Sequence, residues 1–255
     1  RMFAAPSRAS QTPASDTGSP QRSMTPGMCV VMNEMWNPQM PKLPAQSQNS
    51  RERRLSRTLE ALAAHPAVAG LMVALVPGDR WWPGLLECLG KPVRTTSGGA
   101  ERAQSVLNGL RALPASVGSR DWVLVHDAAR PCLRPDDLSR LVELGTRHPV
   151  GALLAQPMSD TVKRADGLGQ SEATVARGNL WRAQTPQLFR RGELTEALDA
   201  MLSIGSLPTD EANALEVLGK SPLLVEGSAD NLKVTSAIDR ILAAAILESR
   251  KQSVS

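Results

Sequence analysis

The chain has 255 residues and a net charge of +4 at pH 7, a length that suits one large α/β domain. Its three cysteines are widely spaced and form no Cys-x-x-Cys pair, so we expect neither a zinc site nor a disulfide framework, and a reducing compartment fits best. No apolar run is long enough to span a membrane and no apolar N-terminal core resembles a signal peptide, so we expect a cytoplasmic protein without membrane contact.

The basic excess lies in the N-terminal part of the chain. Residues 1–55 contain seven Lys or Arg and three acids, and this balance equals the net charge of the whole chain. Residues 56–255 are therefore neutral overall and lack the basic footprint of a nucleic-acid-binding protein. Aromatic residues that could stack on bases are also few, with two Phe, five Trp and no Tyr. We expect no nucleic-acid partner.

The N-terminal segment also differs from the rest in composition. Residues 1–55 carry seven of the 19 prolines and six of the nine methionines, and they show no sustained helical or strand period. Such a segment buries too little apolar surface to offset its ordering entropy. We therefore divide the chain into an atypical segment, 1–54, disordered to about residue 52 apart from a short apolar piece at Met28–Met32, and a domain over 55–255.

Beyond this boundary, apolar periodicity predicts alternating strands and helices. In chain order we expect helix 55–63, strand 68–76, strand 92–96, helix 102–113, strand 122–126, helix 135–146 and strand 151–155. After a break in the pattern we expect strand 180–183, helices 190–202 and 209–218, strand 223–225 and helix 237–249. This alternation predicts an α/β fold with a mostly parallel sheet.

The break covers about residues 156–180. Two short, polar, β-prone segments, 160–164 and 174–177, flank a turn that contains Gly167 and Gly169. This pattern predicts a β-hairpin arm that projects from the domain. A two-stranded arm is marginally stable alone, so we expect it to pack against a partner.

The strand that ends at Asp127 carries the clearest functional signal. The apolar run Trp122–Val125 leads into His126-Asp127-Ala128-Ala129-Arg130-Pro131, which places a carboxylate at the C-terminal end of a buried strand. Open α/β sheets bind ligands at this edge. From these residues alone Asp127 is equally well explained as a cap of the next helix.

Six segments, in order and at compatible spacing, carry a resemblance to a known family. They are GGAERAQSVLNGL (98–110), VLVHDAARP (123–131), DTVKRA (160–165), LWRAQTPQLF (180–189), TDEANALE (209–216) and VEGSADNLKVT (225–235). Together they resemble the 2-C-methyl-D-erythritol 4-phosphate cytidylyltransferases, from about Thr58 to Ile246. The resemblance implies a Rossmann-like domain with helices on both faces, a β-arm and a homodimer. It also implies Mg²⁺-dependent transfer of CMP from CTP to a polyol phosphate in non-mevalonate isoprenoid synthesis.

The resemblance assigns the reaction chemistry to three residues. Asp127 and Asp230 follow predicted strands and are the two acids that could share Mg²⁺, which prefers hard oxygen ligands. Lys233 could place an ammonium near the reacting phosphate. The structural alternatives are an Asx-turn at Asp230 and a solvated surface lysine at Lys233.

The resemblance also assigns binding residues. Gly98, Gly99, Arg102 and Ser105 match the part of the family that contacts the cytosine, although the glycines alone could simply start a helix. Thr161, Arg177 and Thr209 match residues that hold the sugar-phosphate acceptor, the first two reaching the neighbouring subunit's site from the arm. Without the resemblance, Arg177 would be an ordinary exposed base.

Other polar residues have structural interpretations. We interpret His126 as a buried histidine with its hydrogen bonds satisfied and Arg130 as the partner of a nearby acid. Glu211 is interpreted as a charge at a helix N-terminus, and Glu216 as part of a solvated face.

The opening of the chain departs from the family. Relatives begin with a central apolar strand, an A-A-G-x-G-x-R loop that wraps the triphosphate, and a P-K-Q sequence. Residues 1–54 contain only Gly18 and Gly27, and Pro41-Lys42 resembles the P-K pair only in isolation. We expect both the loop and the central strand to be missing, through a frame or gene-model error or a degraded gene. We keep two alternatives to transfer of CMP to methylerythritol phosphate. One is a cytidylyltransferase for another polyol phosphate, such as ribitol 5-phosphate, and the other is a non-catalytic dimeric remnant.

Overall fold

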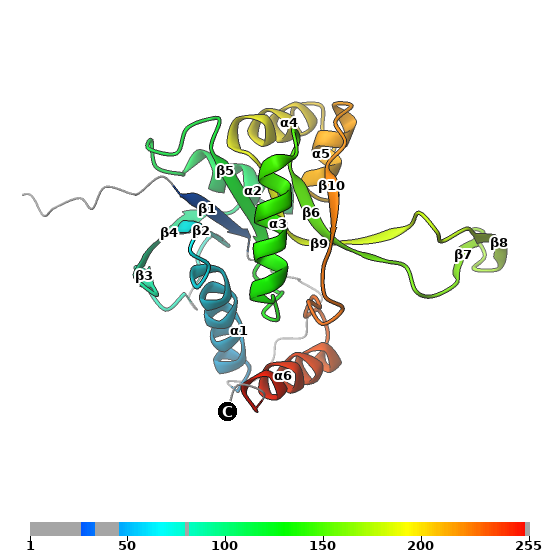
Figure 1. The fold of residues 1–255 in the computed structure, drawn as a ribbon, viewed down its shortest axis with the longest axis horizontal. Coiled ribbons are helices and arrows are strands. Elements are labelled where there is room, and N and C mark those ends of the chain that lie inside the picture. The colour runs from blue at the N-terminus through cyan, green and yellow to red at the C-terminus, as the bar shows by residue number, and fades with distance from the viewer. Residues whose placement is uncertain (1–26, 34–45, 80–81, 253–255) are drawn as a thin grey trace, which may run out of the picture.

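The computed structural model describes residues 27–33, 46–79 and 82–252, which form one large mixed sheet with helices on both faces (Figure 1). The sheet has eight strands in the order β10-β6-β9-β5-β1-β2-β4-β3. They are β1 (Met28–Asn33), β2 (Val68–Leu75), β3 (Glu87–Cys88), β4 (Lys91–Ser97), β5 (Trp122–Asp127), β6 (Ala152–Pro157), β9 (Trp181–Arg190) and β10 (Leu223–Glu226). The pairs β4–β2, β2–β1, β1–β5 and β6–β10 are parallel, which confirms the predicted α/β fold with a mostly parallel sheet.

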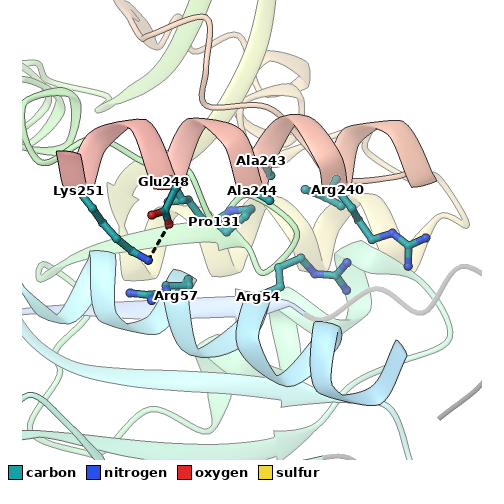
Figure 2. Close-up of a pocket in the computed structure, with 10 residues that line it drawn as sticks. Arg54, Arg57, Pro131, Arg240, Ala243, Ala244, Glu248 and Lys251 are labelled. Atoms are coloured by element: carbon teal, nitrogen blue, oxygen red, sulfur yellow. Dashed lines mark hydrogen bonds and ion pairs between the residues drawn. The ribbon is translucent and has the colours of Figure 1, made fainter. Parts of the chain in front are cut away.

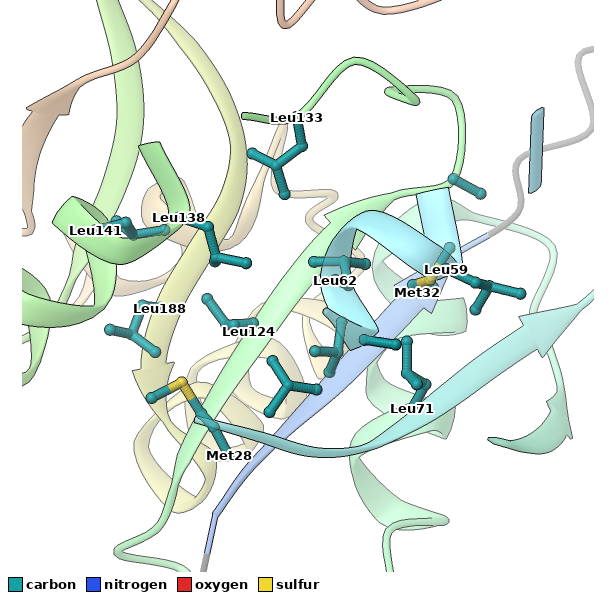
Figure 3. Packing of buried hydrophobic residues seen from close by; sticks show 14 of the residues in the cluster. Met28, Met32, Leu59, Leu62, Leu71, Leu124, Leu133, Leu138, Leu141 and Leu188 are labelled. Atoms are coloured by element: carbon teal, nitrogen blue, oxygen red, sulfur yellow. The ribbon is translucent and has the colours of Figure 1, made fainter. Parts of the chain in front are cut away.

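Helices cover the two faces of the sheet and divide the core in two. The described helices are α1 (Gln46–Ala63), α2 (Arg102–Arg111), α3 (Pro135–Arg147), α4 (Arg191–Ser203), α5 (Glu211–Val217) and α6 (Ala237–Gln252). On one face, leucines of α1 and α3, such as Leu59 and Leu138, pack with Leu124 of β5 (Figure 3). On the other face, α2, α4 and α5 contribute Leu107, Leu198 and Leu215 to a second cluster.

The strand β1 corrects our expectation that the chain lacks the central strand of the sheet. Met28–Asn33 lies between β2 and β5 and pairs with both in parallel, so it occupies the middle of the sheet. All six of its residues are buried, as is typical of a central strand in a parallel sheet, and this burial accounts for the apolar composition of the piece. The polar, proline-rich residues on either side of this strand are the reason that the sequence did not predict it.

The helix α1 also begins earlier than predicted. It starts at Gln46, before the boundary that we drew at residue 54. Its first turns are polar and show no apolar stripe, whereas Leu55, Leu59 and Leu62 are fully buried farther along. The predicted disorder of residues 1–26 and 34–45, and the position of Lys42, lie outside the described residues.

The strand β9 is longer than the predicted segment 180–183. It continues to Arg190 and runs antiparallel between β5 and β6. Its second half, from Gln184 to Phe189, is buried on both faces and therefore lacks the alternation that marks a half-exposed strand.

The predicted arm is present. The strands β7 (Val162–Ala165) and β8 (Ser171–Val175) pair antiparallel with each other and form a separate two-stranded sheet (Figure 1). The turn is organised by Asp166, whose Oδ1 accepts hydrogen bonds from the backbone N–H groups of Leu168 and Gln170. Nearly every arm residue is exposed. Among the described helices, none is long and apolar enough to cross a membrane.

Candidate active site

The candidate site begins where two central parallel strands end side by side. Asn33 is the last residue of β1 and is in register with Asp127, the last residue of β5. Both side chains are almost fully buried. The Asn33 amide satisfies both neighbours when its nitrogen donates to Asp127 Oδ1 at 3.2 Å and its oxygen accepts from Arg102 Nε at 3.2 Å. Asn33 was not predicted as a site residue, although it directly follows the apolar piece at 28–32.

Asp127 is surrounded by cations. Its carboxylate lies 2.9 Å from Lys233 Nζ, 3.2 Å from Arg102 Nη2 and 3.8 Å from Arg130 Nε. Burial alone would raise the pKa of this carboxyl, but Arg102 and Lys233 outweigh burial and lower the pKa to about 2. Asp127 is therefore ionised at neutral pH, and the side chains around it carry more positive than negative charge.

Glu211 completes this cluster. It is the first residue of α5, which confirms the predicted charge at a helix N-terminus, but it also has a partner that the sequence did not predict. Its side chain has no exposed surface, and its two oxygens accept hydrogen bonds from Arg102 Nη1 at 2.6 Å and Nη2 at 2.8 Å. Burial raises the pKa of Glu211, whereas this bidentate pairing favours the ionised form that the geometry requires. For Arg102, burial acts to lower the pKa, but the two carboxylates raise it overall. Arg102 is thus held rigidly between Glu211 and Asp127.

The backbone behind Asp127 is fixed by a second layer of polar groups. The Asp127 N–H donates to Thr185 Oγ1 at 3.0 Å, and this hydroxyl also lies 3.0 Å from His126 Nδ1. His126 Nε2 lies 3.1 Å from the carbonyl oxygen of Arg130. His126 is fully buried with both ring nitrogens partnered, which confirms its structural interpretation.

Lys233 and Asp230 lie on one loop but have different partners. The loop is held by Val234, whose N–H donates to the Ala129 carbonyl at 2.8 Å. Asp230 accepts from Arg134 at 2.6 Å and lies 2.8 Å from Arg250. Within the described part of the chain, no hydrogen bond or ion pair joins Asp230 to the cluster around Asp127.

Gly98 and Gly99 lie at the end of β4, where the chain turns into α2. The backbone of Gly98 passes so close to the end of β2 that an added Cβ would lie 3.1 Å from the Leu75 carbonyl oxygen. At Gly99 an added Cβ would lie 2.2 Å from Gln104 Cγ, so no side chain fits there. Ser105 Oγ accepts a hydrogen bond from the Gly99 N–H at 3.0 Å. These residues form a close-packed backbone turn at the same edge of the sheet.

The predicted acceptor residues lie apart from this cluster. Thr161 and Arg177 are exposed at the base of the arm, where Arg177 donates to the carbonyl of Ser159. Thr209 is exposed just before α5, and its N–H donates to Asn213 Oδ1 at 3.2 Å. Within the described residues of one chain, no hydrogen bond or ion pair links Thr161 or Arg177 to Asp127.

The donor set can be tested for its fit to Mg²⁺. No group of three or more His, Cys, Asp or Glu side chains suited to a metal exists among the described residues. Mg²⁺ commonly uses only one or two protein carboxylates together with substrate phosphates and water. Cations engage both carboxylates, but the ionised Asp127 lies at the edge of the sheet beside Lys233 and fits this role. Asp230 forms its ion pairs with Arg134 and Arg250, outside this cluster.

Comparison with known proteins places the chain in a family. Residues 39–249 match the family described as 2-C-methyl-D-erythritol 4-phosphate cytidylyltransferase. The chain belongs to the 2-C-methyl-D-erythritol 4-phosphate cytidylyltransferase family. The match begins ahead of Thr58, where we expected the resemblance to start.

Relatives from two genera share more than half of the aligned residues. The cytidylyltransferase of Stenotrophomonas maltophilia (strain R551-3) is 57% identical over 185 residues, which cover 72% of this chain and 80% of that protein. That of Xanthomonas axonopodis pv. citri (strain 306) is 56% identical over 72% of this chain and 70% of that protein. The sequence resemblance to the cytidylyltransferases is therefore confirmed.

Solved structures of cytidylyltransferases have the same fold. The Francisella tularensis enzyme superimposes with a TM-score of 0.71 at 30% identity, over 86% of this chain and all of that one. A structure described as 4-diphosphocytidyl-2C-methyl-D-erythritol synthase gives a TM-score of 0.70 at 34% identity, over 88% of this chain and all of that one. The Rossmann-like architecture that the resemblance implied is therefore confirmed.

Proposed function

We propose that this protein transfers CMP from CTP to 2-C-methyl-D-erythritol 4-phosphate and releases pyrophosphate. The observation that carries the proposal is the ionised Asp127, placed at the C-terminal edge of the sheet between Arg102 and Lys233. Phosphoryl and nucleotidyl transfer depend mainly on positioning and on electrostatic stabilisation of phosphate charge. A preorganised, dominantly cationic cluster around one carboxylate supplies both.

The residues divide the chemistry between them in this proposal. Lys233, whose side chain is about one third exposed, directs an ammonium toward the phosphate that is attacked. Arg102 is fixed by Glu211, so it loses little conformational freedom when it meets the nucleotide. Gly98, Gly99 and Ser105 offer a close backbone surface for the base.

The metal assignment is narrower than the sequence suggested. Asp127 would bind Mg²⁺ together with phosphate oxygens of the nucleotide, and the ion would neutralise charge on the phosphates. Asp230 instead holds the 230–234 loop to Arg134 and Arg250, which positions Lys233. We therefore assign Asp230 a positioning role.

The acceptor site is proposed to be shared between two subunits. Thr161 and Arg177 lie on an arm whose strands pair only with each other in the described chain, so a homodimer would bring them to the partner's Thr209 and Lys233. The planar guanidinium of Arg177 suits recognition of the acceptor phosphate.

The family's triphosphate loop has no counterpart in the sequence that follows Asn33. The chain leaves β1 at Asn33, beside Asp127, but residues 34–45 (EMWNPQMPKLPA) contain no glycine that could form the family's loop. A loop rich in backbone N–H donors is a strong triphosphate binder. We expect loss of even one such donor to slow turnover by about 10²–10³-fold.

The test compares two proteins. One is the chain as it stands, and the other carries an A-A-G-x-G-x-R loop after Asn33. Pyrophosphate release should require CTP, methylerythritol phosphate and Mg²⁺, and it should be at least a hundredfold faster with the loop. Asp127→Asn should remove Mg²⁺-dependent CTP binding measured by calorimetry, whereas Asp136→Asn, at an exposed position on α3, should not.

Two results would contradict the proposal. Faster transfer to ribitol 5-phosphate than to methylerythritol phosphate would assign a different acceptor. Absence of CTP binding in the folded, loop-bearing protein would identify the chain as a non-catalytic remnant.

A further inference from the structure

A cavity lies between α1 and α6, outside the cluster around Asp127. Its volume is about 290 Å³. Figure 2 shows α6, which carries Ala243 and Ala244, on one side and α1, which carries Arg54 and Arg57, on the other. Its apolar wall consists of Pro131, Val234, Ala243, Ala244 and Leu247.

The other residues that line the cavity are charged, and most are basic. They are Arg54, Arg57, Arg240, Lys251 and Glu248. Arg57 pairs with Glu60 at 3.3 Å and Lys251 with Glu248 at 3.0 Å, so part of this charge is balanced. Arg240 forms no hydrogen bond or ion pair with any other residue that the structure describes. The cavity therefore combines an apolar wall with an excess of positive charge.

We propose that this cavity binds a small amphiphilic anion, a short apolar chain that carries a phosphate head. The apolar wall would take up the chain, and Arg240 would meet the head, because guanidinium groups pair well with phosphate oxygens. At roughly 30 Å³ for each water-sized group, the cavity holds about ten such groups. A chain of about six carbons therefore fits with its head at the basic rim.

Hydrogen bonds to three backbone carbonyl groups connect the walls of the cavity to the segment that follows Asp127. On the α1 side, Thr58 Oγ1 donates to the Ala128 carbonyl at 3.1 Å. On the α6 side, Arg250 donates to the Cys132 carbonyl at 2.9 Å. The wall residue Val234 donates to Ala129 and directly follows Lys233. A ligand in the cavity would therefore stabilise the segment that follows Asp127 and the loop that carries Lys233, and this coupling holds whether or not the chain turns over CTP.

The test is calorimetric titration of the full chain with three probes. Hexyl phosphate should bind at one site. Hexanol, which lacks the phosphate, and inorganic phosphate, which lacks the apolar chain, should each bind at least tenfold more weakly. Ala244→Phe, which fills the cavity from an exposed position on α6, should weaken hexyl phosphate at least tenfold. Arg240→Glu should do the same. Arg147→Glu, an exposed charge reversal on α3, is the matched control and should change affinity less than twofold.

Hydrogen exchange provides a readout that does not depend on catalysis. Hexyl phosphate should slow amide exchange in peptides covering residues 228–236, and it should leave the arm peptide 162–175 unchanged. The slowing should disappear in Ala244→Phe.

Three outcomes would overturn the proposal. If inorganic phosphate bound as tightly as hexyl phosphate, and Ala244→Phe changed neither affinity, the protein would only attract phosphate to a basic surface. Binding of phosphatidic acid vesicles without binding of monomeric hexyl phosphate would indicate a membrane surface instead. Binding of hexyl phosphate without slower exchange at 228–236 would remove the coupling to the active site.

Discussion

The charged cluster at the edge of the large sheet and the β7–β8 arm differ in where their polar side chains lie and what they contact. In the cluster, Glu211 and Asp127 are buried and partnered by Arg102 within one chain. In the arm, the residues are exposed and the two strands pair only with each other. The charged cluster of the proposed nucleotide site is therefore held together within a single subunit, whereas the proposed acceptor site needs a second one. Substitutions in the two regions should consequently fail in different ways.

The largest effect is expected where the cluster loses a buried charge. Glu211→Ala would leave the Arg102 guanidinium buried with one partner fewer, and breaking a buried pair costs about 3–5 kcal/mol of unfolding free energy. Urea denaturation would measure the loss. Glu216→Ala, at an exposed position on the same helix, is the control and should change stability by about 0.5 kcal/mol or less. Equal losses of unfolding free energy for the two substitutions would show that the Glu211–Arg102 pair does not stabilise the fold.

The second prediction concerns complementation between subunits. In the loop-bearing protein, Arg177→Ala and Asp127→Ala should each lower turnover by about 10²–10³-fold, because each removes a preorganised charge from the site. A heterodimer of the two variants has one site with both defects and one with neither. Mixing them should therefore restore up to about half of the wild-type activity per heterodimer. A monomer in analytical ultracentrifugation, or verified heterodimers without activity, would remove the shared-site proposal.

A pH effect should arise from the layer behind Asp127. Burial lowers the pKa of His126 to about 4, against an ordinary value of 6.5. As pH falls from 6.5 toward 4, the unfolded chain binds a proton that the folded chain does not, so unfolding becomes easier by up to about 3 kcal/mol. His126→Gln should flatten this part of the stability curve, measured by urea denaturation at each pH. An unchanged slope would assign the acid sensitivity to other groups.

The smallest effect is expected on the arm. Lys163 Nζ donates to Thr174 Oγ1 at 2.6 Å across the exposed hairpin. Lys163→Ala should change the stability of the subunit by no more than about 0.5 kcal/mol, because exposed contacts contribute little. A loss above about 2 kcal/mol would show that the arm is integrated into the subunit core.

Local patterns predicted much of the fold because most elements show their period clearly. The helix α3 begins at Pro135 as expected, and β2, β5 and α4 agree with their predictions to within one or two residues. The two main failures were β1, a six-residue strand whose polar surroundings hide it, and the second half of β9, which is buried on both faces. In both, tertiary burial decides the structure and leaves no local period to detect.

The sequence predicted Asp127 at the C-terminal edge of the sheet, where the structure also brings Arg102 and Lys233, but it did not predict the residues that support them. Glu211 lies far along the chain from Arg102, and the two meet only because α2 and α5 both pack against α4. Asn33 was missed because its strand was missed. Partners that meet only through tertiary contacts give no signal in a single sequence, so roles based on pairing were the least predictable.

The position of β9 has a consequence for how the protein folds during synthesis. β1, β2, β4 and β5 can assemble as soon as Asp127 has emerged, because the pairings that join these four strands need no later part of the chain. One edge of β5 then remains unpaired until β9, which follows the whole arm, inserts between β5 and β6. An apolar strand edge that waits unpaired is a template for aggregation. We therefore expect nascent chains that end before Trp181 to bind chaperones and full-length chains to be released from them.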